Sequence, residues 1–132
     1  MNILIDTQIL VWIQEDNPAF SERARAMLTN SLNQIYVSQI SLIEIAIKQK
    51  IGKIPDFKVS LKELISQTEQ DGFRIIRLDN QHIAFYDRIP LYADHRDPFD
   101  RLILATSLAE QMPLISADEK FSRYHPIVDV IW

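Results

Sequence analysis

The chain has 132 residues, a formal net charge of −4 at pH 7 and an apolar content of 47%. This length and composition predict one folded domain, residues 1–132, with a hydrophobic core, and they exclude a disordered chain. The absence of cysteine excludes disulfides, zinc–thiolate sites and thiol nucleophiles.

The ends and the charge of the chain set further expectations. The N-terminal residues lack the basic region and long apolar run of a signal peptide, and no segment approaches the roughly 20 apolar residues that cross a bilayer. We therefore expect a soluble, cytoplasmic protein with no membrane association. The negative net charge argues weakly against nucleic-acid binding. That argument fails if several acids converge on a divalent cation, because the ion inverts the local charge.

The hydrophobic pattern predicts short apolar strands that alternate with helices along the whole chain. Alternation of this kind is typical of a parallel sheet covered by helices on both faces, an α/β fold. In chain order, the predicted elements are a strand at 3–5, helices at 9–13 and 21–30, a strand at 35–38, helices at 40–50 and 61–68, a strand at 73–78, helices at 83–85 and 98–109, a strand at 113–116, a short helix at 121–124 and an edge strand at 127–131.

Polar residues mark where the first helices begin. Asp6 or Thr7 is predicted to cap the first helix, and Asn17-Pro18 to open the second. Ser60 and Glu63 fit the capping-box pattern S-x-x-E for the helix that begins at about residue 61.

The same signals recur in the second half of the chain. Asp79 is predicted to cap a short helix, and a loop over residues 89–96 leads into an apolar core helix. Asp97 fits the N-cap of that helix, with Pro98 at its first position.

Four acids are placed to meet at one edge of the predicted sheet: Asp6, Glu44, Asp100 and Asp118. Asp6 and Asp118 closely follow strands, and Glu44 and Asp100 lie in the first turns of helices that follow strands or loops. Because open parallel sheets bind ligands at the carboxyl ends of their strands, four separate segments would aim carboxylates into one cleft.

Each acid also has a purely structural interpretation. Ser41 and Glu44 form a second S-x-x-E pattern, so Glu44 is a candidate for capping alone. Asp97 is more readily explained as an N-cap than as a ligand, and Asp6 or Asp118 alone would be an ordinary cap or turn residue. Capping explains the acids one at a time, but it does not explain why all four lie on the same edge.

Converging carboxylates repel one another unless a cation lies between them. Oxygen ligands without cysteine or paired histidines favour Mg²⁺ or Mn²⁺ over zinc. The chemistry typical of such a site is hydrolysis of a phosphodiester, for which no side-chain nucleophile is required.

Four motifs together resemble PIN-domain ribonucleases, and most closely the VapC-type toxins of bacterial toxin–antitoxin pairs. The run at residues 95–103 is the most specific of them, and the resemblance covers nearly the full chain. The motifs are LIDT at residues 4–7, SLIEIAIK at 41–48, HRDPFDRLI at 95–103 and LISAD at 114–118.

The resemblance implies a three-layer α/β/α PIN-like domain with a central, mainly parallel sheet. It also implies a Mg²⁺- or Mn²⁺-dependent endoribonuclease, an RNA substrate, a cognate VapB-like antitoxin that masks the site, and a homodimer. Asp6, Glu44 and Asp100 match the family's acidic ligands, Asp118 matches a more variable fourth acid, and Asp97 matches a subfamily acid. Asp97 and Asp100 both remain candidates for the direct metal ligand, with Asp100 favoured.

Several neighbouring residues are candidates for substrate or water contacts. Thr7 could hydrogen-bond a metal-bound water or Asp6, or it could simply begin a helix. Ser116 could line the cleft or only satisfy a strand end. Arg96 and Arg101 could hold phosphate oxygens, although local salt bridges are the better interpretation for Arg101.

The three histidines are less informative than the acids. His95 could steer RNA or shuttle a proton, but a single loop histidine more often does neither. His82 and His125 are expected to be exposed to solvent.

Two other functions are compatible with the sequence. In a phosphatase or receiver-like domain, Asp6 would accept a phosphoryl group, but Gln8 stands where one such family has a second aspartate. In a non-catalytic module, the fold would bind RNA or protein without chemistry, and the full set of acids counts against this alternative.

Overall fold

The computed structural model describes every residue from Met1 to Trp132. Its centre is a sheet of five strands in the order β3-β2-β1-β4-β5, and every neighbouring pair is parallel, as predicted. The strands are β1 (Asn2–Ile5), β2 (Gln34–Ser38), β3 (Arg74–Ile76), β4 (Leu114–Ile115) and β5 (Val130–Ile131).

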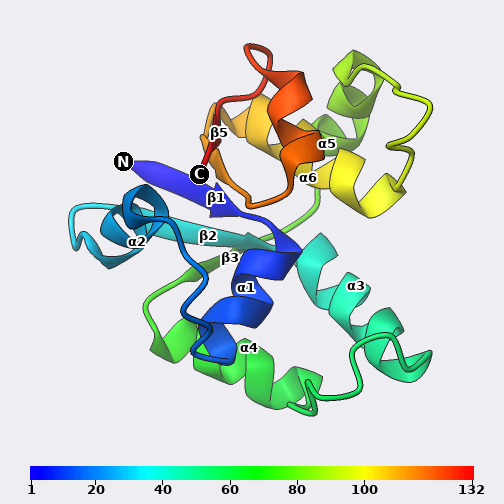
Figure 1. Ribbon diagram of the computed structural model, residues 1–132. Coiled ribbons are helices and arrows are strands. Elements are labelled where there is room, and N and C mark those ends of the chain that lie inside the picture. The colour runs from blue at the N-terminus through cyan, green and yellow to red at the C-terminus, as the bar shows by residue number, and fades with distance from the viewer.

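Helices cover both faces of the sheet and complete the three-layer α/β/α arrangement. Figure 1 shows α5 and α6 on one side of the sheet, and α1 and α4 on the other. The helices are α1 (Thr7–Gln14), α2 (Glu22–Thr29), α3 (Gln39–Lys50), α4 (Leu61–Gln70), α5 (Asn80–Phe85) and α6 (Pro98–Glu110), with short 3-10 helices η1 (Tyr86–Arg88) and η2 (Glu119–Tyr124). None of them is both long and apolar enough to cross a bilayer.

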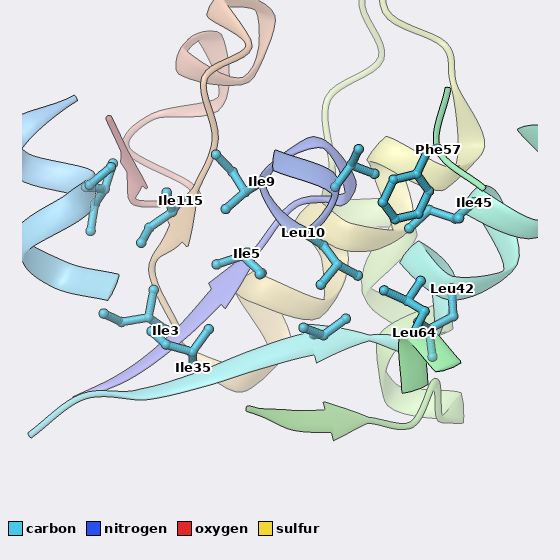
Figure 2. Packing of buried hydrophobic residues seen from close by; sticks show 14 residues of the cluster. Ile3, Ile5, Ile9, Leu10, Ile35, Leu42, Ile45, Phe57, Leu64 and Ile115 are labelled. Atoms are coloured by element: carbon cyan, nitrogen blue, oxygen red, sulfur yellow. The ribbon is translucent and has the colours of Figure 1, made fainter. Parts of the chain in front are cut away.

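The central strand β1 divides the apolar interior into two cores, because successive side chains of a strand point to opposite faces. Ile3 and Ile5 are fully buried against residues of α1, α3 and α4, a core that Figure 2 shows. Leu4 points the other way and joins the residues of α6 and η2.

The register of the sheet brings three strand ends to one level. Ile5 pairs with Val37 on one side and with Ile115 on the other, so β1, β2 and β4 end together. Asp6 follows β1 directly, and its backbone N–H donates to the carbonyl of Ile115 at 3.2 Å. This shared edge is where the acids were expected to gather.

Two helix starts differ from the sequence prediction. The second helix does not open at Asn17-Pro18: the Asn17 side chain accepts from the backbone of Ala19 in a turn, and Ser21 caps α2 instead. The cap of α3 is Ser38, whose hydroxyl accepts from the N–H of Ile40 at 3.0 Å.

The remaining caps agree with the prediction. Side chains of Asp6, Ser60, Asp79 and Asp97 cap α1, α4, α5 and α6. Ser60 accepts from the N–H of Glu63, but the reciprocal bond of a full capping box is absent. The last two strands exist but are shorter than predicted. Before β5, the chain turns after η2 and the N–H of Val128 donates back to the carbonyl of Tyr124, so this strand begins later than predicted.

Candidate metal centre

A cleft of about 620 Å³ opens at the carboxyl edge of the sheet. The structure brings every acid predicted from the sequence to this one cleft, although they come from four separate segments. The predicted acids that line it are Asp6 after β1, Glu44 of α3, Asp97 and Asp100 at the start of α6, and Asp118 after β4, and Glu15 and Asp56 line it as well.

Glu44 is held by partners on both of its oxygens. Its side chain is buried, Oε1 lies 2.6 Å from the Thr7 hydroxyl, and Oε2 lies 2.8 Å from the Lys48 ammonium. The Thr7 hydroxyl also lies 3.0 Å from that of Ser41. The capping interpretation of Ser41 and Glu44 is therefore wrong, because both lie inside the helix that Ser38 caps. Thr7 contacts Glu44 rather than Asp6.

Asp97 and Asp100 both face Glu44. One carboxylate oxygen from each of the three acids lies within 4.8 Å of the other two, a spacing that can hold a metal ion. Asp97 is exposed and also caps α6, since its Oδ1 accepts from the N–H of Phe99 at 2.8 Å. Asp100 is more buried and is bonded to His95. The geometry therefore admits both acids as ligands of one ion.

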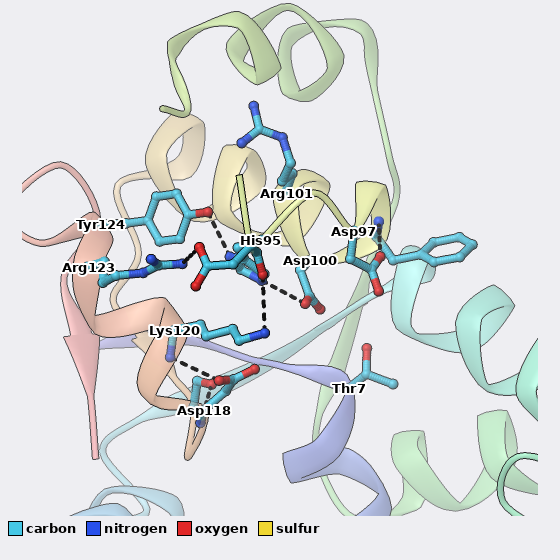
Figure 3. A network of polar contacts seen from close by, with 12 residues as sticks. Thr7, His95, Asp97, Asp100, Arg101, Asp118, Lys120, Arg123 and Tyr124 are labelled. Carbon is cyan, nitrogen blue, oxygen red and sulfur yellow. Dashed lines mark hydrogen bonds and ion pairs between the residues drawn. The ribbon is translucent and has the colours of Figure 1, made fainter. Parts of the chain in front are cut away.

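His95 connects Asp100 to the second core. Its Nε2 lies 2.9 Å from Asp100 Oδ2, and its Nδ1 lies 2.7 Å from the hydroxyl of Tyr124 (Figure 3). Asp118 lies within 4.8 Å of the His95–Asp100 pair. With both ring nitrogens engaged, the buried imidazole orients the Asp100 carboxylate, as outer partners of metal ligands commonly do. The partner Tyr124 is 29 residues away, so sequence reasoning had no signal for this contact.

Asp6 lies beside the acid groups rather than within them. It belongs to neither of the two groups of cleft residues whose ligand atoms lie within 4.8 Å of one another, although it lines the same cleft. One oxygen accepts from the N–H of Ile9 at 2.8 Å, and the Ser116 hydroxyl lies close enough to the carboxyl group to lower its pKa. Ser116 also accepts from the backbone of Asp118 at 3.1 Å. Ser116 therefore links the two acids that follow β1 and β4.

Two carboxylates of the cleft, Asp6 and Asp100, are hard to ionise. Burial raises the pKa of Asp6 to about 7, against the lowering effect of Ser116 and Ile9, and the charge of Asp100 raises it further. Burial also raises the pKa of Asp100 to about 6, opposed by the hydrogen bond from His95. A bound divalent cation would offset this cost, and the oxygen-only donor set fits a hard ion such as Mg²⁺ or Mn²⁺.

Lys48 carries the positive charge nearest to these acids. Burial disfavours its charged form, but the hydrogen bond to Glu44 and the charges of Glu44, Asp100 and Asp97 raise its pKa above the usual value. Lys48 ends the 41–48 motif, one helical turn after Glu44, but the sequence pattern alone assigns it no role.

The two arginines of the 95–101 motif have different positions. Arg101 is buried, and its guanidinium donates to the carbonyls of Pro90 and Ile89 at 2.6 and 2.8 Å, pointing away from the acids (Figure 3). It also lies over the ring of Tyr86. This placement does not support the expected phosphate contact of Arg101, and neither salt bridge expected for the pair is present. Arg96 is exposed.

We expect Arg101→Met to lower the free energy of unfolding by about 2–3 kcal/mol, because two loop carbonyls lose charged donors. Urea denaturation measures the change. Arg96→Met is the matched control on the exposed side of the same loop, and its effect should stay within about 0.5 kcal/mol. Equal destabilisation by the two substitutions would contradict the structural role of Arg101.

His82 is a correction to the prediction of an exposed histidine. Its side chain is 1% exposed, and its Nε2 lies 2.7 Å from Glu110 Oε1 of α6. Its Nδ1 accepts from the N–H of Asp79 in the capping box of α5. His82 therefore fastens α5 to α6, and its partner 28 residues away was invisible in the sequence. His125 is exposed, as predicted.

Comparisons with known proteins bear on this geometry. The PIN domain family model matches residues 3–125. No curated protein sequence matches the chain. Among solved structures, the fold is similar to DNA-bound VapBC from Salmonella typhimurium, with TM-score 0.68, 16% identity, and coverage of 99% of this chain and 97% of that one.

Two further structures share the fold. VapBC2 from Rickettsia felis bound to a promoter DNA fragment has TM-score 0.66 and 19% identity, covering 99% of this chain and 98% of that one. A member of the VapBC family of toxin–antitoxin systems from Mycobacterium tuberculosis has TM-score 0.66 and 13% identity, covering 98% of this chain and 97% of that one. Identities this low establish the fold alone. The match to the family model extends over nearly the whole sequence, and the chain therefore belongs to the PIN domain family.

Proposed function

We propose that this chain is a Mg²⁺- or Mn²⁺-dependent endoribonuclease that hydrolyses RNA phosphodiester bonds and acts as the toxin of a toxin–antitoxin pair. The observation that carries the proposal is the convergence of Glu44, Asp97 and Asp100 within 4.8 Å in a cleft that Asp6 and Asp118 also line. Helix capping accounts for Asp6, Asp97 and Asp118 one at a time, but it accounts for neither Glu44 nor Asp100.

The residues around the acids have distinct roles in this proposal. Glu44, Asp97 and Asp100 would hold the ion, which would supply Lewis acidity and activate water for attack on phosphorus. Thr7 fixes Oε1 of Glu44, and His95 fixes Oδ2 of Asp100. Both carboxylates are thereby oriented before any ligand arrives, which reduces the cost of organising the site.

Asp6 and Asp118 complete the negative wall of the cleft. Ser116 accepts from the backbone of Asp118, and its hydroxyl lowers the pKa of Asp6, so this residue after β4 lies near both acids. On the exposed side, Arg96 is proposed to meet RNA phosphates. We propose that residues 1–132 act as one domain.

The proposed partners are an antitoxin and a second copy of the chain. The similar structures are VapBC proteins, one of them described as belonging to a family of toxin–antitoxin systems, which supports an antitoxin for this chain. A VapB-like antitoxin would silence the site in the cytoplasm, where RNA is available, and we propose that the toxin is a homodimer.

RNA cleavage with and without EDTA tests the proposal. A labelled RNA pool should be cut in the presence of Mn²⁺ or Mg²⁺, remain intact with EDTA, and be cut again when Mn²⁺ is added back. Induced expression without an antitoxin should arrest growth. Undiminished cleavage in EDTA would contradict the proposed metal dependence. RNA that stays intact with every metal would contradict the proposed ribonuclease activity.

The phosphoryl-acceptor alternative finds no support in the position of Asp6. Asp6 is 4% exposed, and its Oδ1 accepts from the N–H of Ile9. Although Asp6 lines the cleft, this burial leaves little of its carboxylate for a phosphoryl donor to reach.

A further inference from the structure

The cleft contains one basic side chain that is paired with an acid of the metal centre. Lys48 Nζ lies 2.8 Å from Glu44 Oε2, one turn further along α3, and its side chain is 38% exposed. The other lysine of the cleft, Lys53, forms no ion pair. Lys48 is therefore the ammonium group that lies closest to the place where an ion would bind.

Glu44 does not need Lys48 for its orientation. The Thr7 hydroxyl lies 2.6 Å from Oε1, the oxygen that Lys48 does not contact. Ser38 caps the helix that carries Glu44, and Ile45 beside it is fully buried. The carboxylate is thus fixed by buried neighbours, whereas Lys48 contributes a mobile charge on a flexible four-carbon stem.

A divalent ion on Glu44 would change the surroundings of Lys48. Two cations on one carboxylate repel each other, so the ammonium would give up Oε2 when the ion binds to this acid. Its partial exposure leaves it free to swing into the cleft while its stem remains on α3.

The charge of the cleft gives the released ammonium a partner. Seven carboxylates and two lysines line the cleft, so a single divalent ion leaves it negative. A phosphodiester is an anion, and its approach to that surface is unfavourable without a further cation. Charge on the non-bridging phosphate oxygens must also be stabilised during hydrolysis, and a positioned ammonium can do this.

We infer that Lys48 is a catalytic residue that leaves Glu44 when that acid binds a divalent ion and then contacts a non-bridging oxygen of the scissile phosphate. It transfers no proton and forms no covalent bond: water adds to phosphorus, one phosphorus–oxygen ester bond breaks, and Lys48 remains an ammonium throughout. This inference rests on the proposed ribonuclease function.

Lys48→Met separates this role from a merely structural one. We expect kcat/KM for a fluorogenic single-stranded RNA to fall about 100-fold, with most of the loss in kcat. The dissociation constant of Mn²⁺, measured by calorimetry on the same protein, should stay equal or decrease, because a competing cation has left Glu44. Lys48→Arg should recover part of the rate. Lys50→Met, an exposed lysine on the same helix, is the matched control and should match the wild type.

Three results would overturn the inference in recognisable ways. Cleavage by Lys48→Met within threefold of the wild type would remove Lys48 from the reaction. Weaker Mn²⁺ binding in proportion to the lost activity would make Lys48 an orienting partner of Glu44 only. Failure of the wild type to cleave any RNA would overturn the proposed function, and the role of Lys48 with it.

Discussion

Replacing Asp100 with asparagine is expected to reduce Mn²⁺-dependent RNA cleavage by about 1000-fold or more while the protein stays folded. Asp100 belongs to both groups of closely spaced ligand atoms in the cleft, with Glu44 and Asp97 in one and with His95 and Asp118 in the other. Asparagine keeps the size of the side chain and can still accept from His95, so the change removes charge with little change in shape. Single-turnover cleavage and Mn²⁺ calorimetry measure the loss.

The same experiment can distinguish the two acids at the start of α6. Asp97→Asn should reduce activity less than Asp100→Asn, because Asp97 is exposed and its N-capping bond to Phe99 survives in asparagine. Asp79→Asn makes the same chemical change at the cap of α5, outside the cleft, and should be as active as the wild type. Full activity in Asp100→Asn would remove that residue from the metal centre.

The architecture follows closely from the apolar pattern of the sequence. Each strand of the sheet is short and apolar, and β1 is buried on both faces, which only a sheet with helices on both sides provides. Asp6 and Asp118 come just after β1 and β4, so parallel topology alone brings them to one edge. This is why the acids could be assigned to a shared cleft before their distances were known.

Contacts between distant segments could not be predicted in this way. The pattern S-x-x-E at residues 41–44 is the same whether or not it caps a helix, and only the buried Thr7 hydroxyl shows that Glu44 serves the cleft. His82 has Glu110 as its partner, and Arg101 has loop carbonyls. Local sequence predicts most of the helix caps, whereas these side chains take their roles from tertiary neighbours.

The pH dependence of stability should reverse sign when a divalent ion is added. Because the pKa of Asp6 is about 7 in the folded protein and 3.8 as its ordinary value, the native state binds more protons than the unfolded state between these limits. Without metal, the free energy of unfolding should therefore fall as the pH rises from about 4 to about 7. Asp100, with a pKa of about 6, acts in the same direction.

Asp6→Asn should raise the metal-free stability at pH 8 by up to about 4 kcal/mol, the equivalent of that pKa difference, and should flatten the pH dependence. Saturating Mn²⁺ needs ionised carboxylates, so with the ion present the stability of the wild type should instead rise over the same range. Urea denaturation from pH 4 to pH 8 measures how the free energy of unfolding changes with pH, without and with Mn²⁺. Asp79→Asn is the exposed control. If the free energy of unfolding of the metal-free wild type instead rises from pH 4 to pH 7, burial does not raise the pKa of Asp6 in the folded protein, and the prediction is wrong. In that case a bound cation would not be needed to keep the carboxylates of this cleft ionised.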